Sequence, residues 1–517
     1  MPKFKICLIN PPVLTVLEPW YDTPDFGRTG LAYLAGYLRQ YEGFDIKIID
    51  AKLERLTFQE VLHRVIEFDP KIVGLTAFTN EIKPAAYQAA LIKKSLPEIV
   101  TVVGGVHVTA IPKETLQEFN SFDIGVVGEG EVTFYELCSA IKNSNPIDQI
   151  NGLVFRGSNG IQLSKPRLRI LDQDSIPLPA WDLLPRADTY FIQTLRGCPF
   201  DCKFCMNPNG KVARKRSVES VMKEIHWIID TYQAKRISFG DELFSVDMER
   251  TRNLLDAMAE ANIGDKIKWD VQTHVRFVDL DMFHRFKKAK VDRVEMGIET
   301  GDEDIMKKMG KGISLEKIVN AYENARIAGV DIGTFFIIGQ PNENKESIRR
   351  TIQLATKINP KLPMFGVMTP YPGTEVGRLA AKGEGGYKLL TTDWDEYNKQ
   401  IGGAMEFANL NRRKIEWIQI KAYTSVFLKN GRVLDFLKLL WEYRIGAFSL
   451  LKKMIKNQKG LDAMLNKPID YDELLASDYK VPKEIMVSAM EDWKSTQKTE
   501  LSRAKKEAPD LFNIELT

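Results

Sequence analysis

The 517-residue sequence has little of what marks a secreted, membrane-spanning or nucleic-acid-binding protein. It contains only five cysteines, an odd number that does not suit a secreted disulfide framework. No apolar run approaches the ~20 residues of a membrane span, and the N-terminus runs into a strand-like segment without a signal peptide. The net charge of +3 provides no field that would attract nucleic acid. We therefore predict a cytoplasmic protein of two or three domains with no nucleic-acid partner.

Three of the five cysteines lie close together, in the segment RGCPFDCKFC from Arg196 to Cys205. Thiolates in C-x3-C-x2-C spacing can converge on one metal centre, but they are too few to complete a four-coordinate iron–sulfur cube. One iron would stay open, as a cluster that binds and reduces a substrate requires. Two other interpretations remain. A structural zinc site needs a fourth ligand that no nearby histidine supplies, and the three cysteines can also be unconnected.

This segment resembles the signature loop of the radical SAM superfamily. The resemblance implies that Cys198, Cys202 and Cys205 hold a 4Fe-4S cluster. The fourth iron of that cluster would chelate the amino and carboxylate groups of S-adenosylmethionine (SAM). Phe204 matches the aromatic residue that usually precedes the last cysteine, which implies that it lies near the adenine.

Residues 1–145 alternate strand-like and helical patterns. Five βα units predict a parallel, doubly wound, Rossmann-like sheet whose ligand lies beyond the carboxyl ends of the strands. Glycines after a strand let the backbone approach a bulky or phosphate-bearing ligand closely. The strands are expected at 4–10, 44–50, 71–78, 99–105 and 123–129, followed in four cases by Asn10-Pro11-Pro12, Thr76 with Thr79, Gly104-Gly105 and Gly128-Glu129-Gly130-Glu131. A flavodoxin-like module that binds nothing is the alternative.

These strand ends together resemble the cobalamin-binding domain of one large subclass of radical SAM enzymes, with its GG-x-H-x-T stretch at 104–109 and its GEGE at 128–131. No Asp-x-His-x-x-Gly follows the first strand, so the resemblance implies a base-off cobalt without a histidine ligand. For His107 we expect a helix-cap or loop hydrogen bond. The residues implied in cobalamin binding are Thr76, Gly104, Gly105, Gly128, Glu129 and Gly130.

Residues 146–189 predict a β-hairpin and then a proline-stiffened linker. Residues 190–400 again alternate strands and helices. Six βα units predict a partial parallel (β/α)6 barrel, open on one side, with its site at the carboxyl ends of the strands. The cysteine segment follows the first of these strands, so the other strand ends are expected to face the cluster.

Several residues at these strand ends are candidates for the site. Gly240, Asp241 and Glu242 resemble the superfamily motif that holds the SAM amino group, although Asp241 and Glu242 also suit a helix N-cap pair. Arg276 closes the third strand and Glu299 the fourth. A buried acid needs a partner, so for Glu299 we expect a ribose diol or the guanidinium of Arg293 or Arg276.

Tyr371 follows the sixth strand and is the candidate catalytic residue, facing the substrate. A rigid turn at Thr369–Thr374 is the equally supported alternative.

Residues 401–517 predict a helical region, with helices at 412–428, 432–444 and 447–456. The stretch 429–459 has eight basic residues and two acids among leucines and aromatic residues. Basic amphipathic helices can lie on anionic membranes, although more often they cap a domain with a solvated face. Peripheral membrane contact through this tail would indicate a lipid or hydrophobic substrate.

The leading hypothesis is a cobalamin-dependent radical SAM C-methyltransferase. The resemblance implies that cleaved SAM yields a 5′-deoxyadenosyl radical, which activates an unactivated carbon of a small-molecule or lipid-like substrate, and that methylcobalamin supplies the methyl group. A reductase, flavodoxin or ferredoxin would donate electrons. A cyclisation or rearrangement without methyl transfer is the alternative. A methylthiotransferase is disfavoured, because the first domain lacks a second cysteine trio and the tail is helical, and a non-catalytic cobalamin carrier would not need the trio.

Overall fold

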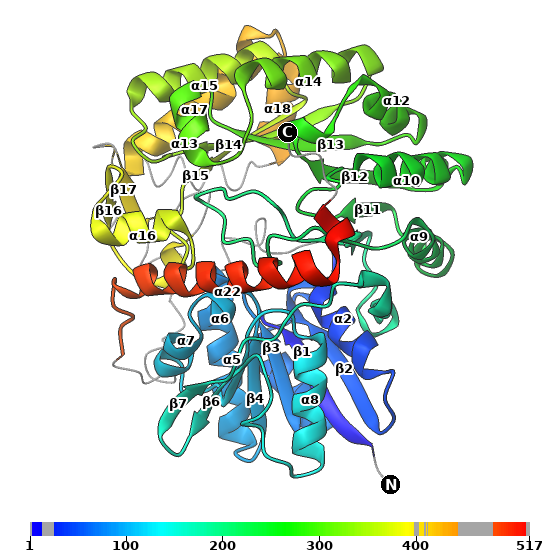
Figure 1. Ribbon diagram of the computed structural model, residues 1–517, viewed down its shortest axis with the longest axis vertical. Helices are drawn as coiled ribbons and strands as arrows, with labels where there is room; N and C mark the ends of the chain where they lie inside the picture. Colours follow the sequence, from blue (N-terminus) through cyan, green and yellow to red (C-terminus); the bar gives the residue numbers. More distant parts are fainter. Residues whose placement is uncertain are drawn as a thin grey trace.

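The computed structural model describes residues 3–12, 25–397, 403–407, 410, 412–442 and 479–512. Two α/β domains lie one above the other, and a long C-terminal helix crosses the boundary between them (Figure 1). Residues at the carboxyl ends of strands in both sheets line one shared cavity. This arrangement brings the two predicted cofactor domains into contact.

The first domain is built on a seven-stranded sheet of order β2-β1-β3-β4-β5-β6-β7. Its first five strands are parallel, and the chain winds outward from β1 to both sides. The apolar run from Ile6 to Ile9 is buried completely, as expected of a strand covered by helices on both faces. The predicted doubly wound sheet is therefore confirmed. Its strands are β1 Phe4–Asn10, β2 Phe44–Asp50, β3 Ile72–Thr76, β4 Val100–Gly104, β5 Ile124–Val126, β6 Leu153–Gly157 and β7 Gly160–Leu163, and its helices α2 Thr29–Leu38, α3 Ala51–Glu54, α4 Phe58–Phe68, α5 Ile82–Ser95, α6 Val106–Ala110, α7 Pro112–Glu118 and α8 Glu131–Lys142.

The hairpin that we assigned to the linker at 146–189 extends this first sheet. Strand β6 pairs antiparallel with β5, with Val154 opposite Gly125, and β7 pairs with β6. Val154 also packs against Val108 and Leu116 at the sheet face, which explains why the hairpin docks rather than projecting as a connector. The remaining domain boundaries, at 190 and 400, stay predictions.

The second domain is a six-stranded parallel sheet in chain order, β8-β11-β12-β13-β14-β15. In the described part of the chain no strand joins β8 to β15, so the barrel is open, as predicted. Ile237 and Phe239 alternate with less buried neighbours, so one face of β11 packs on helices and the other lines the barrel. The strands are β8 Thr189–Ile192, β11 Arg236–Phe239, β12 Lys268–Thr273, β13 Arg293–Glu299, β14 Ile332–Ile338 and β15 Leu362–Val367, and the main helices α9 Val218–Tyr232, α10 Met248–Glu260, α12 Leu280–Lys288, α13 Glu303–Met309, α14 Leu315–Ala328, α15 Lys345–Ile358 and α16 Glu375–Lys382.

The C-terminal region is helical, as predicted. Helix α17 (Arg412–Lys429) packs on β15 and α15, and α18 (Val433–Glu442) follows it. The helix expected at 447–456 lies outside the described residues. Helix α22 (Ile485–Glu507) runs across the front of the molecule (Figure 1). None of the helices that the structure describes is long and apolar enough to cross a membrane.

Helix α22 clamps the segment that carries the cysteines. The indole Nε1 of Trp493 donates to the carbonyl of Met206 at 2.5 Å, and the amide of Gln497 donates to the carbonyl of Asn207 at 3.2 Å. Trp493 also packs with Met206 against Ala110 of α6. One helix thereby ties the cysteine loop to the first domain.

Buried ion pairs join the two domains. Strands β9 (Leu195–Arg196) and β10 (Arg214–Lys215) pair antiparallel with Arg196 opposite Arg214, so their guanidinium groups reach the first domain together. Arg214 Nη1 lies 2.9 Å from Glu129 Oε2, and Arg196 Nη2 lies 2.7 Å from Glu131 Oε1. Burial raises the pKa of Glu129, but the charges of Arg214 and Arg196 outweigh burial and lower it overall. The cluster is therefore ionised and neutralised internally.

A second contact between the domains buries His107. Its ring lies 4.9 Å from that of Trp394, whose Nε1 donates to Glu118 at 2.8 Å. Neither ring nitrogen of His107 has a hydrogen-bond partner among the described residues, so the expected helix-cap or loop hydrogen bond is wrong. Burial lowers the pKa of His107 to about 3. The imidazole is therefore a neutral packing group.

We predict that His107 makes the protein sensitive to acid. Its folded pKa lies below the ordinary value of about 6.5, so stability is lost as the pH falls below 6.5, by about 1.4 kcal/mol per pH unit until the folded pKa is reached. Replacing it, as in His107→Leu, should reduce the loss of unfolding free energy between pH 7 and pH 5 by about 2 kcal/mol. Denaturant unfolding of both proteins at the two pH values measures this. His63→Gln, at an exposed position on α4, is the control, and an unchanged pH slope in His107→Leu would contradict the prediction.

We also predict that Glu129→Gln weakens the domain contact. The substitution removes one of the carboxylates that neutralise the buried guanidinium groups of Arg196 and Arg214. Breaking a buried ion pair in this way lowers the free energy of unfolding by about 3–5 kcal/mol. The matched control is Glu136→Gln, because Glu136 pairs with Arg167 at a more exposed site of the same domain and such pairs contribute at most about 1 kcal/mol. Equal losses of unfolding free energy in the two variants would show that the buried cluster has no special weight.

Candidate active site between the domains

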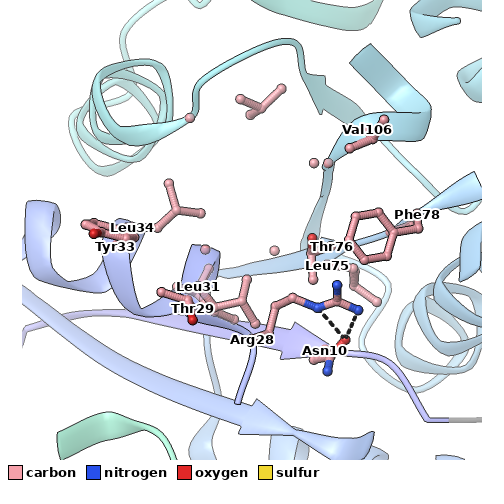
Figure 2. A pocket seen from close by; sticks show the side chains of 18 of the residues that line it. Asn10, Arg28, Thr29, Leu31, Tyr33, Leu34, Leu75, Thr76, Phe78 and Val106 are labelled. Atoms are coloured by element: carbon pink, nitrogen blue, oxygen red, sulfur yellow. Dashed lines mark hydrogen bonds between the residues drawn. The ribbon is translucent and has the colours of Figure 1, made fainter. Parts of the chain in front are cut away.

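A cavity of about 660 Å³ lies between the two sheets (Figure 2). Its walls from the first domain follow the ends of β1, β3, β4 and β5, and the second domain contributes Phe191, Gln193, Arg196, Pro208 and Asn209. The six residues that we predicted to bind cobalamin all line this one cavity: Thr76, Gly104, Gly105, Gly128, Glu129 and Gly130. The side chain of Glu129 is already paired with Arg214 of the second domain, so it stabilises the contact between the two domains.

The glycine loops present bare backbone to the cavity. Gly105 has φ of +108°, and a Cβ there would lie 2.5 Å from the carbonyl oxygen of Ala77, so only glycine suits the position. A Cβ at Gly104 or Gly128 would meet no atom within 4 Å. The Thr109 hydroxyl donates to the Gly105 carbonyl at 2.8 Å and accepts from the Gly128 amide at 3.0 Å. The threonine of the GG-x-H-x-T stretch thus joins both loops.

A buried polar network that the sequence did not reveal lies at the β1 end of the cavity. Arg28 donates to Asn10 Oδ1 at 3.2 Å and stacks 4.5 Å from the ring of Phe78 (Figure 2). Its guanidinium also donates to Glu81 Oε1 at 2.8 Å. Lys52 also contacts Glu81, at 2.7 Å. Burial raises the pKa of Glu81, but Arg28 and Lys52 outweigh it and lower the pKa to about 2. The described residues that line the cavity include no histidine, which fits a cobalt without a histidine ligand.

The cysteine loop lies between β9 and β10. Cys198 and Cys202 are half-buried and Cys205 is exposed. The Cys198 amide donates to the Gly210 carbonyl at 2.9 Å, and the Asn207 side chain donates to the Cys198 carbonyl at 2.5 Å. Burial raises the pKa of Cys198 to about 12, and the neighbouring Cys202 and Cys205 add to this shift.

The donor set of the loop, three thiols without a fourth ligand, fits a cluster better than a structural zinc ion. Within the described ranges no three His, Cys, Asp or Glu side chains are close enough to hold one metal ion, which argues against the zinc interpretation. In a 4Fe-4S cluster each thiolate binds a different iron, so its ligands stand farther apart. The donor set of three thiols on one braced loop therefore fits a cluster with one open iron.

The side chain of Asp241 is engaged within the protein. Its carboxylate accepts from the Thr194 amide and hydroxyl, both at 2.6 Å, and from the Leu195 amide at 3.0 Å. Burial raises the pKa of Asp241 to about 6 despite these hydrogen bonds. The carboxylate holds the turn between β8 and β9, and the contact of Asp241 with the SAM amino group stays a prediction for its backbone.

Gly240 and Glu242, by contrast, lie at the edge of the cluster loop. A side chain at Gly240 would overlap the ring of Phe191, which lines the cavity. Glu242 accepts from the Gly197 amide at 3.3 Å and from the side-chain amide of Asn209. Neither residue caps a helix, since Asp247 is the N-cap of α10.

Glu299 has a different partner from those expected. The ammonium group of Lys311 contacts its carboxylate, whereas Arg293 pairs with Glu295 at 2.8 Å. Glu299 also has φ of +68°, a backbone conformation that residues other than glycine rarely adopt and that is common at functional sites. Lys311 lies in the segment Met309–Gly312. The sequence does not indicate that this segment lies beside the end of β13.

Arg276 offers an unused donor beside the cluster loop. Its Nε is buried and has no hydrogen-bond partner among the residues that the structure describes. A Cβ on Gly312 would lie 3.3 Å from its guanidinium and 3.7 Å from the ring of Phe200, so the guanidinium and the cluster loop are close. A buried donor without a partner is costly, and an anionic ligand would satisfy it.

Tyr371 does not line the cavity. Its hydroxyl donates to the carbonyl of Tyr397 at 3.1 Å, and its ring packs beside the first domain's core. The structure thus favours the rigid-turn interpretation over the catalytic one. Phe204 is partly buried against the core of the second domain.

Comparisons with known proteins agree with this geometry. The B12 binding domain model matches residues 21–138, and the Radical SAM superfamily model matches residues 192–355. An uncharacterized methyltransferase of Pyrococcus horikoshii is 34% identical over 439 residues, which cover 83% of this chain and 94% of that protein. The anaerobic magnesium-protoporphyrin IX monomethyl ester cyclase of Rubrivivax gelatinosus is 27% identical over 384 residues, covering 71% of this chain and 68% of the cyclase.

A solved structure shares the whole fold. The radical S-adenosylmethionine methyltransferase TsrM from Kitasatospora setae, with cobalamin and a [4Fe-4S] cluster bound, matches with a TM-score of 0.65 over 96% of this chain and 100% of that chain, at 16% identity. These findings confirm the predicted fold, family and cofactors. The chain belongs to the radical SAM superfamily and is a cobalamin-dependent radical SAM enzyme with a B12-binding domain ahead of its radical SAM domain.

Proposed function

We propose that this enzyme is a C-methyltransferase that acts on an unactivated carbon of a small-molecule or lipid-like substrate. The observation that carries the proposal is the shared cavity, whose walls combine the glycine loops of the B12-binding domain with Arg196 and Asn209, which flank the cluster cysteines. Groups that exchange a short-lived intermediate must be held within reach of each other. The methyltransferase relative supports the same reaction class.

The residues of the first domain would hold cobalamin through backbone and shape. Gly104, Gly105 and Gly128 offer bare backbone, and Thr76 adds a hydroxyl at the cavity wall. Arg28 borders the cavity and shares the carboxylate of Glu81 with Lys52. These residues suit a large cofactor that carries amide and phosphate groups.

The second domain would hold the cluster and SAM. Cys198, Cys202 and Cys205 would bind three irons, and Glu242, Arg276 and Glu299 stand around the loop as candidate SAM contacts. The unpartnered Nε of Arg276 suits the SAM carboxylate, and Phe204 is the proposed adenine neighbour. When bound, the cluster, SAM and cobalamin together supply one-electron cleavage of SAM and a transferable methyl group.

A cyclisation without methyl transfer is the second candidate, supported by the cyclase relative. For both reactions we also propose that the protein works in the cytoplasm and that a reductase, flavodoxin or ferredoxin donates the electrons.

The products formed from SAM distinguish the two reactions. Anaerobically reconstituted enzyme is incubated with SAM and a strong reductant, with and without cobalamin, and S-adenosylhomocysteine and 5′-deoxyadenosine are quantified by mass spectrometry. S-adenosylhomocysteine that forms only with cobalamin supports methyl transfer. Deoxyadenosine alone, with cobalamin shown to be bound, supports the cyclase-type reaction and overturns our proposal.

Replacing Cys198, Cys202 and Cys205 together by alanine should remove the bound iron and abolish deoxyadenosine formation, because the open iron that holds SAM is lost. Iron content and product analysis measure this. Cys138→Ala is the matched control, since Cys138 is buried in the first domain's core away from the loop and should leave iron binding intact. Full SAM cleavage in the triple variant would refute the cluster assignment.

A further inference from the structure

Helix α18 exposes an apolar face. Leu434 and Trp441 are 75% and 70% exposed, and Val433, Leu437 and Leu440 are exposed beside them. At 3.6 residues per turn these five side chains form one continuous stripe along the helix. A helix of a globular domain normally turns such a stripe toward the core. In α18 the apolar stripe faces outward instead.

The helix is anchored through its opposite side and its N-terminus. Arg432, just before α18, donates to the carbonyls of Pro360 and Lys361, both at 2.6 Å, and to Asn359 Oδ1 at 3.0 Å. The ring of Phe436 packs 5.7 Å from that of Phe427 on α17. These contacts hold the stripe outward.

The neighbouring helix adds to the exposed surface. Trp417 and Leu428 of α17, which packs against α18, are also exposed. Of the large apolar side chains that are exposed in the described chain, more than half lie between 417 and 441, and the others are scattered singly. A concentration of this kind marks an interaction surface.

The sequence that contains the stripe is rich in basic residues. Lys429 and Lys438 are exposed at the border of the stripe, while Asp435 is paired with Arg432. Glu442 ends the helix, and the sequence then continues with five more basic residues and no acid from 443 to 459, so the stretch 429–459 carries eight basic residues and two acids. Basic residues around an exposed tryptophan and leucines match an anionic lipid surface, where the apolar side chains reach the acyl boundary and the cations meet phosphates.

We propose that α18 docks the enzyme reversibly on an anionic membrane surface. The stripe (Val433, Leu434, Leu437, Leu440 and Trp441) would enter the headgroup region. The anchoring residues at 359–361 stand just before β15 begins, at the end of the barrel opposite the cluster loop. Docking would therefore leave the cavity between the domains unobstructed.

Cosedimentation of the full-length holoenzyme with vesicles tests this proposal. We expect binding to vesicles of equal parts phosphatidylcholine and phosphatidylglycerol, and at least about tenfold weaker binding to phosphatidylcholine alone or at high salt. The double variant Leu437→Glu and Trp441→Glu should lose vesicle binding while SAM cleavage stays unchanged. The control is Ile327→Glu, which places the same charge at an exposed apolar position on α14 and should bind like the wild type.

Two results would overturn the proposal. One is a wild-type enzyme that ignores anionic vesicles, as expected if another segment of the chain covers the stripe. The other is a wild-type dimer that the stripe variant converts to a monomer without any vesicle binding, which would make the stripe a contact between two copies. Size-exclusion chromatography of both proteins separates these outcomes.

Discussion

The structure depends on one buried cluster of charges at the boundary of its domains. Arg196 ends β9 and is followed directly by Gly197 and Cys198, so a residue that pairs with Glu131 of the first domain also begins the cluster loop. Arg214, its neighbour across the β9–β10 pair, binds Glu129. Buried charges must be paired, and here the pairing holds the cobalamin-side loop against the cluster loop.

The two domains meet through the same kind of edge. In each parallel sheet the loops after the strands gather at the carboxyl end, which is where α/β domains bind ligands. Two such edges placed face to face form a single cavity between the two cofactor sites. Helix α22 and the Trp394 contact then brace the boundary from the outside.

Much of the fold and part of the site could be predicted from sequence. Alternating strands and helices predicted both parallel sheets, because that periodicity is local. The glycine loops and the cysteine trio could be placed for the same reason. What the sequence did not indicate is the partner of each side chain: Asp241 binds Thr194, Glu299 contacts Lys311, and Tyr371 donates to the backbone of Tyr397. The hairpin of β6 and β7 extends the first sheet because β6 also pairs with β5, which lies outside the segment 146–189, and the sequence does not indicate that pairing.

The sequence by itself determined the chemistry of this protein. The spacing of Cys198, Cys202 and Cys205 and the glycines at 104, 105 and 128 are short-range patterns, and the reactive groups that they imply do not depend on the rest of the chain. Only the tertiary structure decided which charges neutralise each other and which surface stays apolar. Arg28 and Glu81 are 53 positions apart and Arg214 and Glu129 are 85 apart. Pairings over such distances, like the outward turn of α18, follow from how whole sheets and helices pack, and no local pattern encodes them.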